Sequence, residues 1–270
     1  MMKANKKKLH DLLVMAGVVA LFAVVAGLLY SGSLSRQVTN MLIPTSVYIV
    51  LAVSLNLVVG LLGELSLGHA GFMSVGLFSG CLVSIALSQT AMPLAVRMVL
   101  AMLAGGLVAA VFGLLVGLPT LRLKGDYLAI VTLACGEIIK NVITNLDITG
   151  GALGLNTSAV YSGAQVLLPY AAALVLITCV VMLNLKRSKY GRAIMAIRDN
   201  RIAAESVGLN VTFFKLAVFV IAAFFAGAAG VLYGHSLANV KAAAFDYNMS
   251  IEILIIVVLG GMGSVPGSII

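Results

Sequence analysis

Residues 186–208, KRSKYGRAIMAIRDNRIAAESVG, form the only long polar segment in a chain that otherwise alternates apolar runs with brief connections. The segment holds six of the 17 Lys and Arg residues of the chain. Long apolar runs lie on both sides of it, so its positive charge indicates on which side of a membrane the connections of the chain lie.

Two short amphipathic helices are predicted within this segment. Three residues recur at the spacing i, i+4 and i+7 and form an apolar stripe, namely Tyr190, Ile194 and Ile197. Asp199 or Asn200 is suited to N-cap a second helix, for which Gly208 is a natural C-terminal stop. A loop needed only for solubility has no use for such helices, so we interpret the segment as a docking surface for another protein.

The composition is that of an integral membrane protein. Of the 270 residues, 61% are apolar and 10% are charged, with a mean hydropathy of +1.14, whereas soluble domains carry about 25% charged residues. The net charge of +8 is concentrated in a few connections, so membrane topology explains it and no nucleic-acid partner is expected. All three cysteines fall in apolar runs, which argues against a disulfide framework: Cys81, Cys135 and Cys179.

At about 20 residues per crossing, the chain has room for around eight spans. We predict an all-α polytopic membrane protein with one transmembrane domain at residues 12–270, preceded by a basic cytoplasmic segment at residues 1–11. The first run is longer than the apolar part of a signal peptide, so we expect an uncleaved span. The predicted spans are Leu12–Tyr30, Met41–Leu62, Ala70–Leu87, Leu94–Leu118, Tyr127–Leu146, Val166–Leu185, Phe213–Gly234 and Ile251–Ile270.

The basic residues support this count and place the N-terminus in the cytoplasm. The predicted cytoplasmic segments are the N-terminus and residues 62–70, 118–127 and 185–213. Together they hold 12 basic residues: Lys3, Lys6, Lys7, Lys8, Arg122, Lys124, Lys186, Arg187, Lys189, Arg192, Arg198 and Arg201. The outer connections hold Arg36 and Lys241, with Arg97 just inside a span end. Losing one span would reverse half of this asymmetry.

A second unusual stretch, GLLGELSLGHAGF at residues 60–72, places four glycines and three polar side chains in an apolar run. Irregular backbone at membrane depth is tolerated only where it is buried in protein or lines a water-filled cavity. A broken helix at a substrate path and a tight cytoplasmic turn both explain the stretch. On the first interpretation the lining residues are Asn56, Ser66, His69 and Phe72. His69 has no second ligand at i+3 or i+4, so no metal is expected.

One predicted span carries a charge near its middle. Glu137 lies where an unpaired charge costs several kcal/mol, and Lys140 lies three residues further on the same helix face. A structural ion pair and a place for Glu137 on a transport path both remain open. Elsewhere, glycines at small-xxx-small spacing favour close helix packing within one bundle over a dimerisation face: Gly76/Gly80, Gly113/Gly117 and Gly230/Gly234.

Several motifs, in order along the chain, resemble one known family. The motifs are Gly63-x-Leu65-Ser66-Leu67-Gly68-His69-Ala70, then Leu123-x-Gly125-Asp126-Tyr127-x-Ala129-Ile130-Val131-Thr132-Leu133, then Ser188-Lys189-Tyr190-Gly191-Arg192-Ala193, Ile202-Ala203-Ala204-Glu205-x-x-Gly208 and Gly260-Gly261-Met262-Gly263. They are similar to the second type of permease subunit, the LivM type, of branched-chain amino acid ABC importers. The likeness runs from about Tyr48 to the last residue.

The resemblance implies a heterodimer with a sister permease subunit, two cytoplasmic ATPase subunits and an extracytoplasmic binding protein. It places the chain in the plasma (inner) membrane as a multi-pass subunit with no cofactor and no catalytic residue of its own. Members of the family usually continue past the glycine-rich motif, so at least one further span is expected beyond Ile270.

The resemblance also implies that residues 186–212 couple the chain to its ATPase. The residues expected to make this coupling are Tyr190, Gly191, Arg198, Ala203, Ala204, Glu205 and Gly208. Importer permeases carry Glu-Ala-Ala-x-x-x-Gly here, whereas this chain has Ile202 in place of the acid and Glu205 on the far side. The contact that Glu205 makes is therefore open.

Other functions are weighed against this one. The chain has no Gly-x-x-x-x-Gly-Lys-Ser/Thr loop, so ATP hydrolysis is assigned to a partner. Urea, short amides or a sugar are alternative substrates. An ion-coupled secondary transporter is an alternative class of protein, which needs paired charged residues at mid-membrane, and only Glu137 and Lys140 meet that requirement. An intramembrane enzyme would need a nucleophile–base pair or metal set, which three scattered histidines do not supply. Residues 147–156 and 241–248 are candidates to receive the binding protein.

Overall fold

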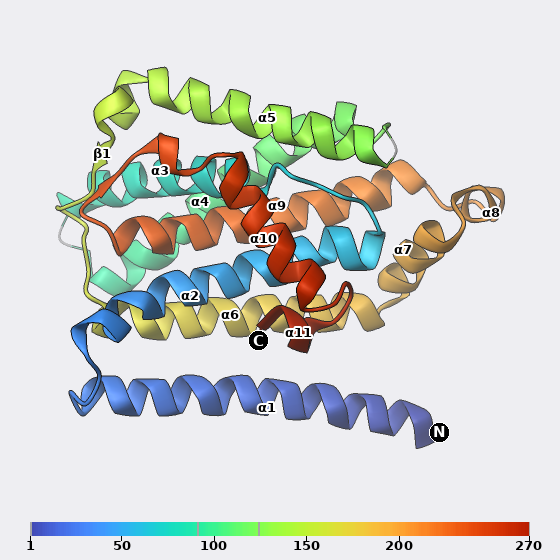
Figure 1. Ribbon diagram of the computed structural model, residues 1–270, viewed down its shortest axis with the longest axis horizontal. Coiled ribbons are helices and arrows are strands. Elements are labelled where there is room, and N and C mark those ends of the chain that lie inside the picture. The colour runs from blue at the N-terminus through green and yellow to red at the C-terminus, as the bar shows by residue number, and fades with distance from the viewer. Residues whose placement is uncertain (1, 91, 124, 270) are drawn as a thin grey trace.

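The computed structural model describes the backbone of residues 2–90, 92–123 and 125–269, and side chains from residue 14 onward within these ranges. Most of the chain is helical, and the long helices lie side by side along one direction (Figure 1). The basic side chains predicted at residues 1–11, and that of Lys124, lie outside the described residues.

The long helices are α1 (Met2–Tyr30), α2 (Arg36–Asn56), α3 (His69–Ser88), α4 (Leu94–Thr120), α5 (Asp126–Asn145), α6 (Ala164–Arg187), α9 (Val211–His235) and α10 (Tyr247–Leu259). The short ones are the π-helix η1 (Leu57–Leu62), α7 (Lys189–Asp199), α8 (Arg201–Ser206) and α11 (Val265–Ile269). Three 3₁₀ turns and two strands complete the elements: η2 (Asp147–Thr149), η3 (Gly151–Leu153), η4 (Ala242–Ala244), β1 (Leu155–Asn156) and β2 (Asn239–Val240).

The prediction of an all-α polytopic membrane protein is confirmed. Within the described residues, seven helical segments are long and apolar enough to cross a membrane, and α1 adds a shorter apolar stretch at Val14–Tyr30. The last span, predicted at Ile251–Ile270, is interrupted near its glycine-rich motif. The helix α10 ends at Leu259, because Gly261 and Gly263 adopt φ angles of +94° and +81° and turn the chain before α11.

The centre of the bundle is α9, which packs against α2, α3 and α4. Glycines make these contacts close, as their spacing predicts. A Cβ at Gly76 would overlap the Cα atom of Gly227, and a Cβ at Gly113 would lie 2.7 Å from the Cβ of Ala223. A Cβ at Gly230 would overlap the carbonyl oxygen of Met73. These glycines therefore serve packing inside the bundle.

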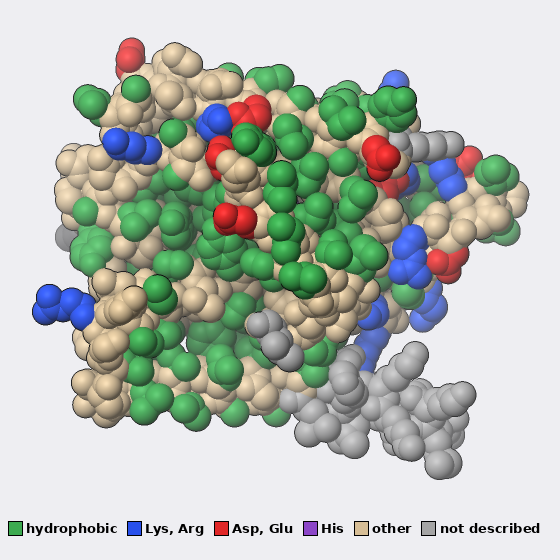
Figure 2. Space-filling model, in the orientation of Figure 1, with side chains coloured by type: hydrophobic (Ala, Val, Ile, Leu, Met, Phe, Trp, Pro, Cys, Tyr) green, Lys and Arg blue, Asp and Glu red, His purple; other side chains and the backbone are tan. Residues whose placement is uncertain are grey.

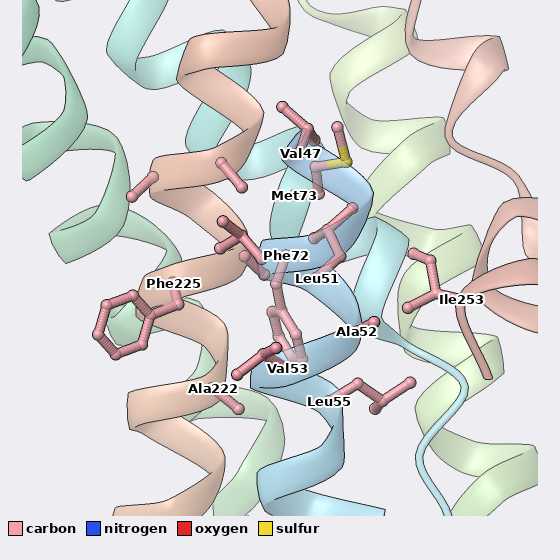
Figure 3. Close-up of a cluster of buried hydrophobic side chains, with 14 of the residues drawn as sticks. Val47, Leu51, Ala52, Val53, Leu55, Phe72, Met73, Ala222, Phe225 and Ile253 are labelled. Atoms are coloured by element: carbon pink, nitrogen blue, oxygen red, sulfur yellow. The ribbon is translucent and has the colours of Figure 1, made fainter. Parts of the chain in front are cut away.

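The helix α2 passes through the hydrophobic core. Every residue from Val50 to Leu62 is buried, which is the behaviour of a helix that is apolar on all sides. Figure 3 shows Leu51 among side chains from neighbouring helices, including Phe72 of α3, Ala222 of α9 and Ile253 of α10. The break in helical structure that follows α2 is thus built into the interior of the chain.

The connections separate into two ends of the bundle (Figure 1). The N-terminal end of α1 and residues 118–123, 125–127 and 185–213 lie at one end, which we call the basic end. Residues 62–70 start at this end and run back along the bundle to α3, where the Leu67 N–H donates to the Thr132 hydroxyl of α5 (3.0 Å). The connections after α1, α3, α5 and α9 lie at the opposite end, where β1 and β2 pair antiparallel, with Leu155 opposite Val240. Residues 260–264 lie instead beside η1, where the Gly263 N–H donates to the Asn56 side chain. This is the alternation that the positive charges predict.

Candidate coupling segment and broken helices

The polar segment at the basic end folds as two short helices. The Ser188 hydroxyl accepts a hydrogen bond from the Gly191 backbone N–H (3.0 Å) and caps α7. The Asn200 side chain accepts one from the Ala203 N–H (3.1 Å), so Asn200 rather than Asp199 caps α8. Gly208 follows α8 with φ of +85°, in the left-handed conformation of a helix stop.

The apolar stripe of α7 faces the bundle. Ile194 and Ile197 are 2% and 3% exposed, whereas Tyr190 is half exposed and its ring lies 6.4 Å from that of Phe214. The stripe therefore fixes α7 to its own chain, and the apolar surface left free for a partner is on and after α8. There Ile202 and Val207 are 80% and 75% exposed.

Sequence reasoning did not select Ile202 or Val207 as partner-binding residues. The signal for Ile202 was its departure from the family pattern. The remaining predicted coupling residues divide into two groups. Ala203, Glu205, Arg198 and Gly208 are exposed, whereas Gly191 and Ala204 are buried, and Ala204 packs against Ile197 and Val211. Glu205 forms an ion pair with Arg201 at 2.9 Å.

Arg198 joins α7 to the broken helix. Its guanidinium Nη1 donates a hydrogen bond to the carbonyl oxygen of Gly60 (3.0 Å), inside the π-helix η1. Its aliphatic part covers Gly63, where a Cβ would lie 2.5 Å from the Arg198 Cγ. A π-helix leaves backbone carbonyls without their usual α-helical partners, and a buried carbonyl requires a donor. Arg198 supplies one from the coupling segment.

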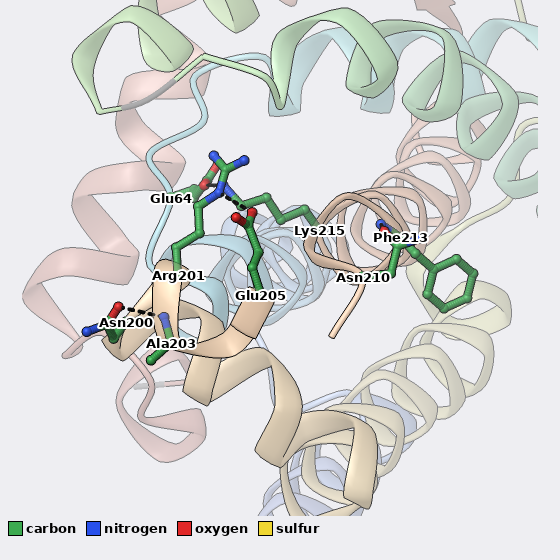
Figure 4. Close-up of polar contacts among 8 residues, drawn as sticks. All are labelled: Glu64, Asn200, Arg201, Ala203, Glu205, Asn210, Phe213 and Lys215. Atoms are coloured by element: carbon green, nitrogen blue, oxygen red, sulfur yellow. Dashed lines mark hydrogen bonds and ion pairs between the residues drawn. The ribbon is translucent and has the colours of Figure 1, made fainter. Parts of the chain in front are cut away.

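A buried ion pair lies beside this contact. Lys215 of α9 pairs with Glu64, and their side chains are 6% and 14% exposed. Figure 4 shows both side chains with Arg201 and Glu205 of α8. They border a polar cavity of about 210 Å³ lined by Leu62, Gly63, Glu64, Ile197, Arg198, Arg201 and Lys215. The sequence placed Glu64 and Lys215 at the same membrane side, but no local pattern indicated that they would pair.

Asn56 connects the two irregular segments of the chain. Its amide nitrogen donates to the Ser264 carbonyl (3.0 Å) and the Ser268 hydroxyl (2.7 Å), and its amide oxygen accepts from the Gly263 N–H (2.7 Å). From α6, the Lys186 ammonium donates to the Gly263 carbonyl at 2.6 Å. The break after α2 and the break after α10 are therefore held together, and they are contacted by Lys186 from the C-terminal end of α6 and by Arg198 from that of α7.

The other predicted path residues are also buried. The His69 imidazole Nε2 lies 2.9 Å from the Ser54 hydroxyl, and Phe72 packs edge-on against Phe219 at 5.4 Å between ring centres. The Ser66 hydroxyl is buried and has no hydrogen-bond partner among the described residues. The path-lining role of Asn56, Ser66, His69 and Phe72 stays a prediction.

Glu137 forms the ion pair with Lys140 that the sequence predicts. It also accepts a hydrogen bond from the Tyr247 N–H (2.9 Å), at the first turn of α10. The carboxylate therefore interacts with the positive end of a helix that belongs to the apolar segment Ala242–Leu259, which is long enough to cross a membrane. Sequence reasoning missed a second polar contact at this depth, where the Tyr48 hydroxyl of α2 lies 3.4 Å from the Glu252 carboxylate of α10.

At the opposite end, the two predicted receptor segments lie next to each other. The strand pair β1–β2 joins them, and the Thr157 hydroxyl donates to the Leu237 carbonyl at 2.6 Å. Ile148 and Leu153 are 73% and 82% exposed. These segments form one surface, whose role in receiving a binding protein stays a prediction.

Long apolar helices, two helix breaks and a polar segment held against them define a multi-pass membrane protein with the architecture of a transport permease. The family model described as branched-chain amino acid transport system / permease component matches residues 37–270, so the chain belongs to this family. The resemblance seen in the sequence motifs is thereby confirmed.

Curated relatives agree with this family. The chain is 37% identical over 264 residues to the high-affinity branched-chain amino acid transport system permease protein LivM of Salmonella typhimurium, and 36% identical to that of Escherichia coli K12. In both cases the match covers 85% of this chain and 60% of the relative, so the chain spans about 60% of their length. It is also 23% identical to the permease protein LivH of E. coli K12 over 251 residues, covering 87% of this chain and 81% of LivH. No solved structure matches the chain.

Proposed function

We propose that the chain is a membrane-spanning permease subunit of an ATP-driven importer for branched-chain amino acids. The support is the family match over residues 37–270 and the substrate named for the LivM relatives. The subunit lies in the plasma (inner) membrane with its basic end in the cytoplasm. It works with a sister permease subunit, two cytoplasmic ATPase subunits and an extracytoplasmic binding protein that delivers the amino acid.

The observation that carries the mechanism is the contact from Arg198 to the Gly60 carbonyl. The exposed residues Ala203, Ile202 and Val207 enter a groove of the ATPase. Nucleotide-driven closure of the ATPase then moves α8 and α7 as one body. Arg198 and the buried stripe of α7 carry this movement to η1, which changes the cytoplasmic end of the path.

A second contact route leads from the same segment to the break between α10 and α11. Lys186, at the C-terminal end of α6, donates to Gly263, and Asn56 joins Gly263 to η1. Movement of the segment therefore acts on both helix breaks together. The substrate needs no fixed site in this mechanism, because a binding protein selects it and the membrane path only has to admit it.

The test is reconstitution. The chain, co-expressed with its neighbouring permease, ATPase and binding-protein genes, should co-purify with the ATPase and take up leucine, isoleucine or valine into proteoliposomes only with ATP and the binding protein. Uptake of urea, short amides or a sugar instead of these amino acids would reassign the substrate and keep the class.

A second function is favoured by one observation. The pair Glu137–Lys140 lies near the middle of α5, which is where ion-coupled transporters carry ionisable groups. For an ion-coupled secondary transporter, the purified chain alone should accumulate substrate under an ion gradient without ATP. Gradient-driven uptake by the lone subunit would replace the importer proposal, and uptake that requires the ATPase would exclude this alternative.

A further inference from the structure

Charged residues in the interior of the spans are confined to two neighbouring helices. When the five residues at either end of each membrane-crossing segment are set aside, the charged residues that remain are Glu137 and Lys140 of α5 and Glu252 of α10. The helices α5 and α10 are in contact. Asp246, which caps α10 through the Met249 N–H (3.2 Å), lies beside them.

These groups lie at membrane depth and reach the surface of the chain. Glu137 is near the middle of α5, and Tyr48, which contacts Glu252, is near the middle of the segment Arg36–Leu62. Glu252 is exposed, and Glu137 and Asp246 are partly exposed. In Figure 2 acidic and basic groups interrupt an otherwise apolar surface over α5 and α10. We call the surface formed by α10 and the adjoining sides of α2 and α5 the polar face.

The surface formed by α4 has the opposite character. Between Met98 and Thr120 it has no charged residue in its sequence, and it exposes only apolar side chains of large size: Val99, Leu100, Leu103, Leu107, Val108, Val111, Phe112, Leu114, Leu115 and Leu118. In Figure 1, α4 lies behind α9 and α10 lies in front of α2. The composition of α4 suits contact with lipid, whereas that of the polar face does not.

We propose that the polar face is covered by the sister permease subunit, with a hydrophilic path between the two chains at the level of Glu252 and Glu137. This inference rests on the proposed function, whose partners it places on the chain. Partners outside the membrane are excluded by depth. A soluble ATPase meets the basic end and an extracytoplasmic receptor meets the opposite end, whereas these groups lie half-way between the ends.

Charge complementarity defines the chemistry of the partner surface. The polar face carries three carboxylates, Glu137, Asp246 and Glu252, and one ammonium, Lys140. Glu137 and Asp246 already have donors within the chain, whereas the described contact of Glu252 is the Tyr48 hydroxyl at 3.4 Å. The sister subunit must therefore present an N–H or O–H donor or a basic group to Glu252, either directly or through water. The chain is similar to both LivM and LivH of E. coli K12, so its relatives include a second permease protein in the same organism.

Photocrosslinking in the intact complex tests the placement. A benzoylphenylalanine is introduced at Ile255 or Val258 of α10, and at Leu107 or Leu115 of α4 as matched positions that are similarly exposed. We expect a product containing the sister permease from the α10 positions and lipid adducts from the α4 positions. Sister-subunit products from α4, or only lipid adducts or a product of two copies of this chain from α10, would overturn the inference.

Substitution of Glu252 provides the second readout. If Glu252 contacts the sister subunit or the path, Glu252→Leu should lower recovery of the sister permease or amino-acid uptake by about tenfold, the loss expected for a hydrogen bond to a charged group. Glu252→Gln should keep most of both. Equal or higher recovery and uptake for Glu252→Leu would indicate contact with lipid and overturn the inference.

The two proposals can fail separately. Crosslinks through α4 in a complex that still imports amino acids with ATP would overturn the placement and keep the function. A chain that takes up substrate alone under an ion gradient would overturn the function, and the inference with it.

Discussion

At the scale of single residues, the contact between the coupling segment and the π-helix η1 includes one hydrogen bond from a guanidinium, that of Arg198. Arg198 is the side chain of α7 that reaches the π-helix, and its partner Gly60 is 138 residues away in sequence. A hydrogen bond from a charged donor contributes about 1.5 to 3 kcal/mol. This is enough to make α7 and η1 move together if the rest of the interface is apolar.

Arg198→Ala should therefore uncouple transport from ATP hydrolysis. We expect the number of amino acids imported per ATP hydrolysed to fall by about tenfold, with the complex still assembled, because the docking residues of α8 are unchanged. Reconstituted uptake and phosphate release measure the ratio. Arg192→Ala is the matched control, because Arg192 is exposed on the same helix. Among the contacts described, its guanidinium donates only to the Arg187 carbonyl, within the same segment. Equal ratios for the two variants would contradict the assignment.

A second single-residue prediction concerns the pair Glu64–Lys215. Removing one partner of a buried pair leaves an uncompensated charge and costs about 3 to 5 kcal/mol. Lys215→Met should therefore lower the unfolding temperature of the purified protein in detergent, because both side chains are largely buried. The double variant Lys215→Met/Glu64→Gln should recover most of the loss. A double variant no more stable than Lys215→Met would show that the pair is not the cause.

At the scale of elements, α8 has an exposed side, which we propose binds the ATPase, and a buried side that holds the segment to the bundle. Ala204 is 3% exposed and packs inward, whereas the neighbouring Ala203 is exposed. The family pattern Ala-Ala thus places one alanine on each side of a short helix. Only a three-dimensional view distinguishes them.

Substituting tryptophan at the two alanines should give opposite results. Ala203→Trp should reduce ATPase recovered with the purified permease by about tenfold and leave the unfolding temperature unchanged, because it alters only an exposed surface. Ala204→Trp should lower the stability of the segment by about 1 to 3 kcal/mol through overpacking. Affinity purification and limited proteolysis of residues 186–212 measure the two effects. Loss of ATPase binding from Ala204→Trp alone would reverse the assignment.

At the scale of the whole molecule, the chain is a bundle whose two ends differ in charge, and we propose a different partner for each. The basic end carries the coupling segment, and the opposite end carries β1–β2 and exposed apolar residues such as Leu153. Positive charge stays on the cytoplasmic side of a membrane protein. In intact cells, a reagent that does not cross the membrane should therefore reach only the end opposite the basic end.

Two cysteine variants test this orientation. Leu153→Cys and Ile202→Cys lie at opposite ends and replace side chains that are 82% and 80% exposed. In a Cys135→Ser background, with Cys81 and Cys179 buried, a membrane-impermeant maleimide should label residue 153 in intact cells. It should label residue 202 only after the cells are opened. Labelling of residue 202 from outside would reverse the topology and remove the basis for ATPase coupling.

The amino-acid sequence by itself determined the properties that depend on local order. Hydropathy defined most of the spans, basic residues predicted their orientation, and glycines at residues 60–72 marked the first break. An apolar stripe predicted α7, and a capping residue with a helix-stop glycine predicted α8. These features follow from residues within one or two helical turns of each other, so they can be read without a fold.

Only the tertiary structure decided which residues meet. It turned Ile194 and Ile197 inward, brought Arg198 to Gly60, joined Asn56 to Ser264 and set Glu137 at the first turn of α10. It also ended the last span at Leu259, where hydropathy alone continued to Ile270. Each of these contacts joins segments far apart in the chain or depends on backbone angles at single glycines. Helix periodicity and hydropathy carry no information on such pairings, which result from how the helices pack.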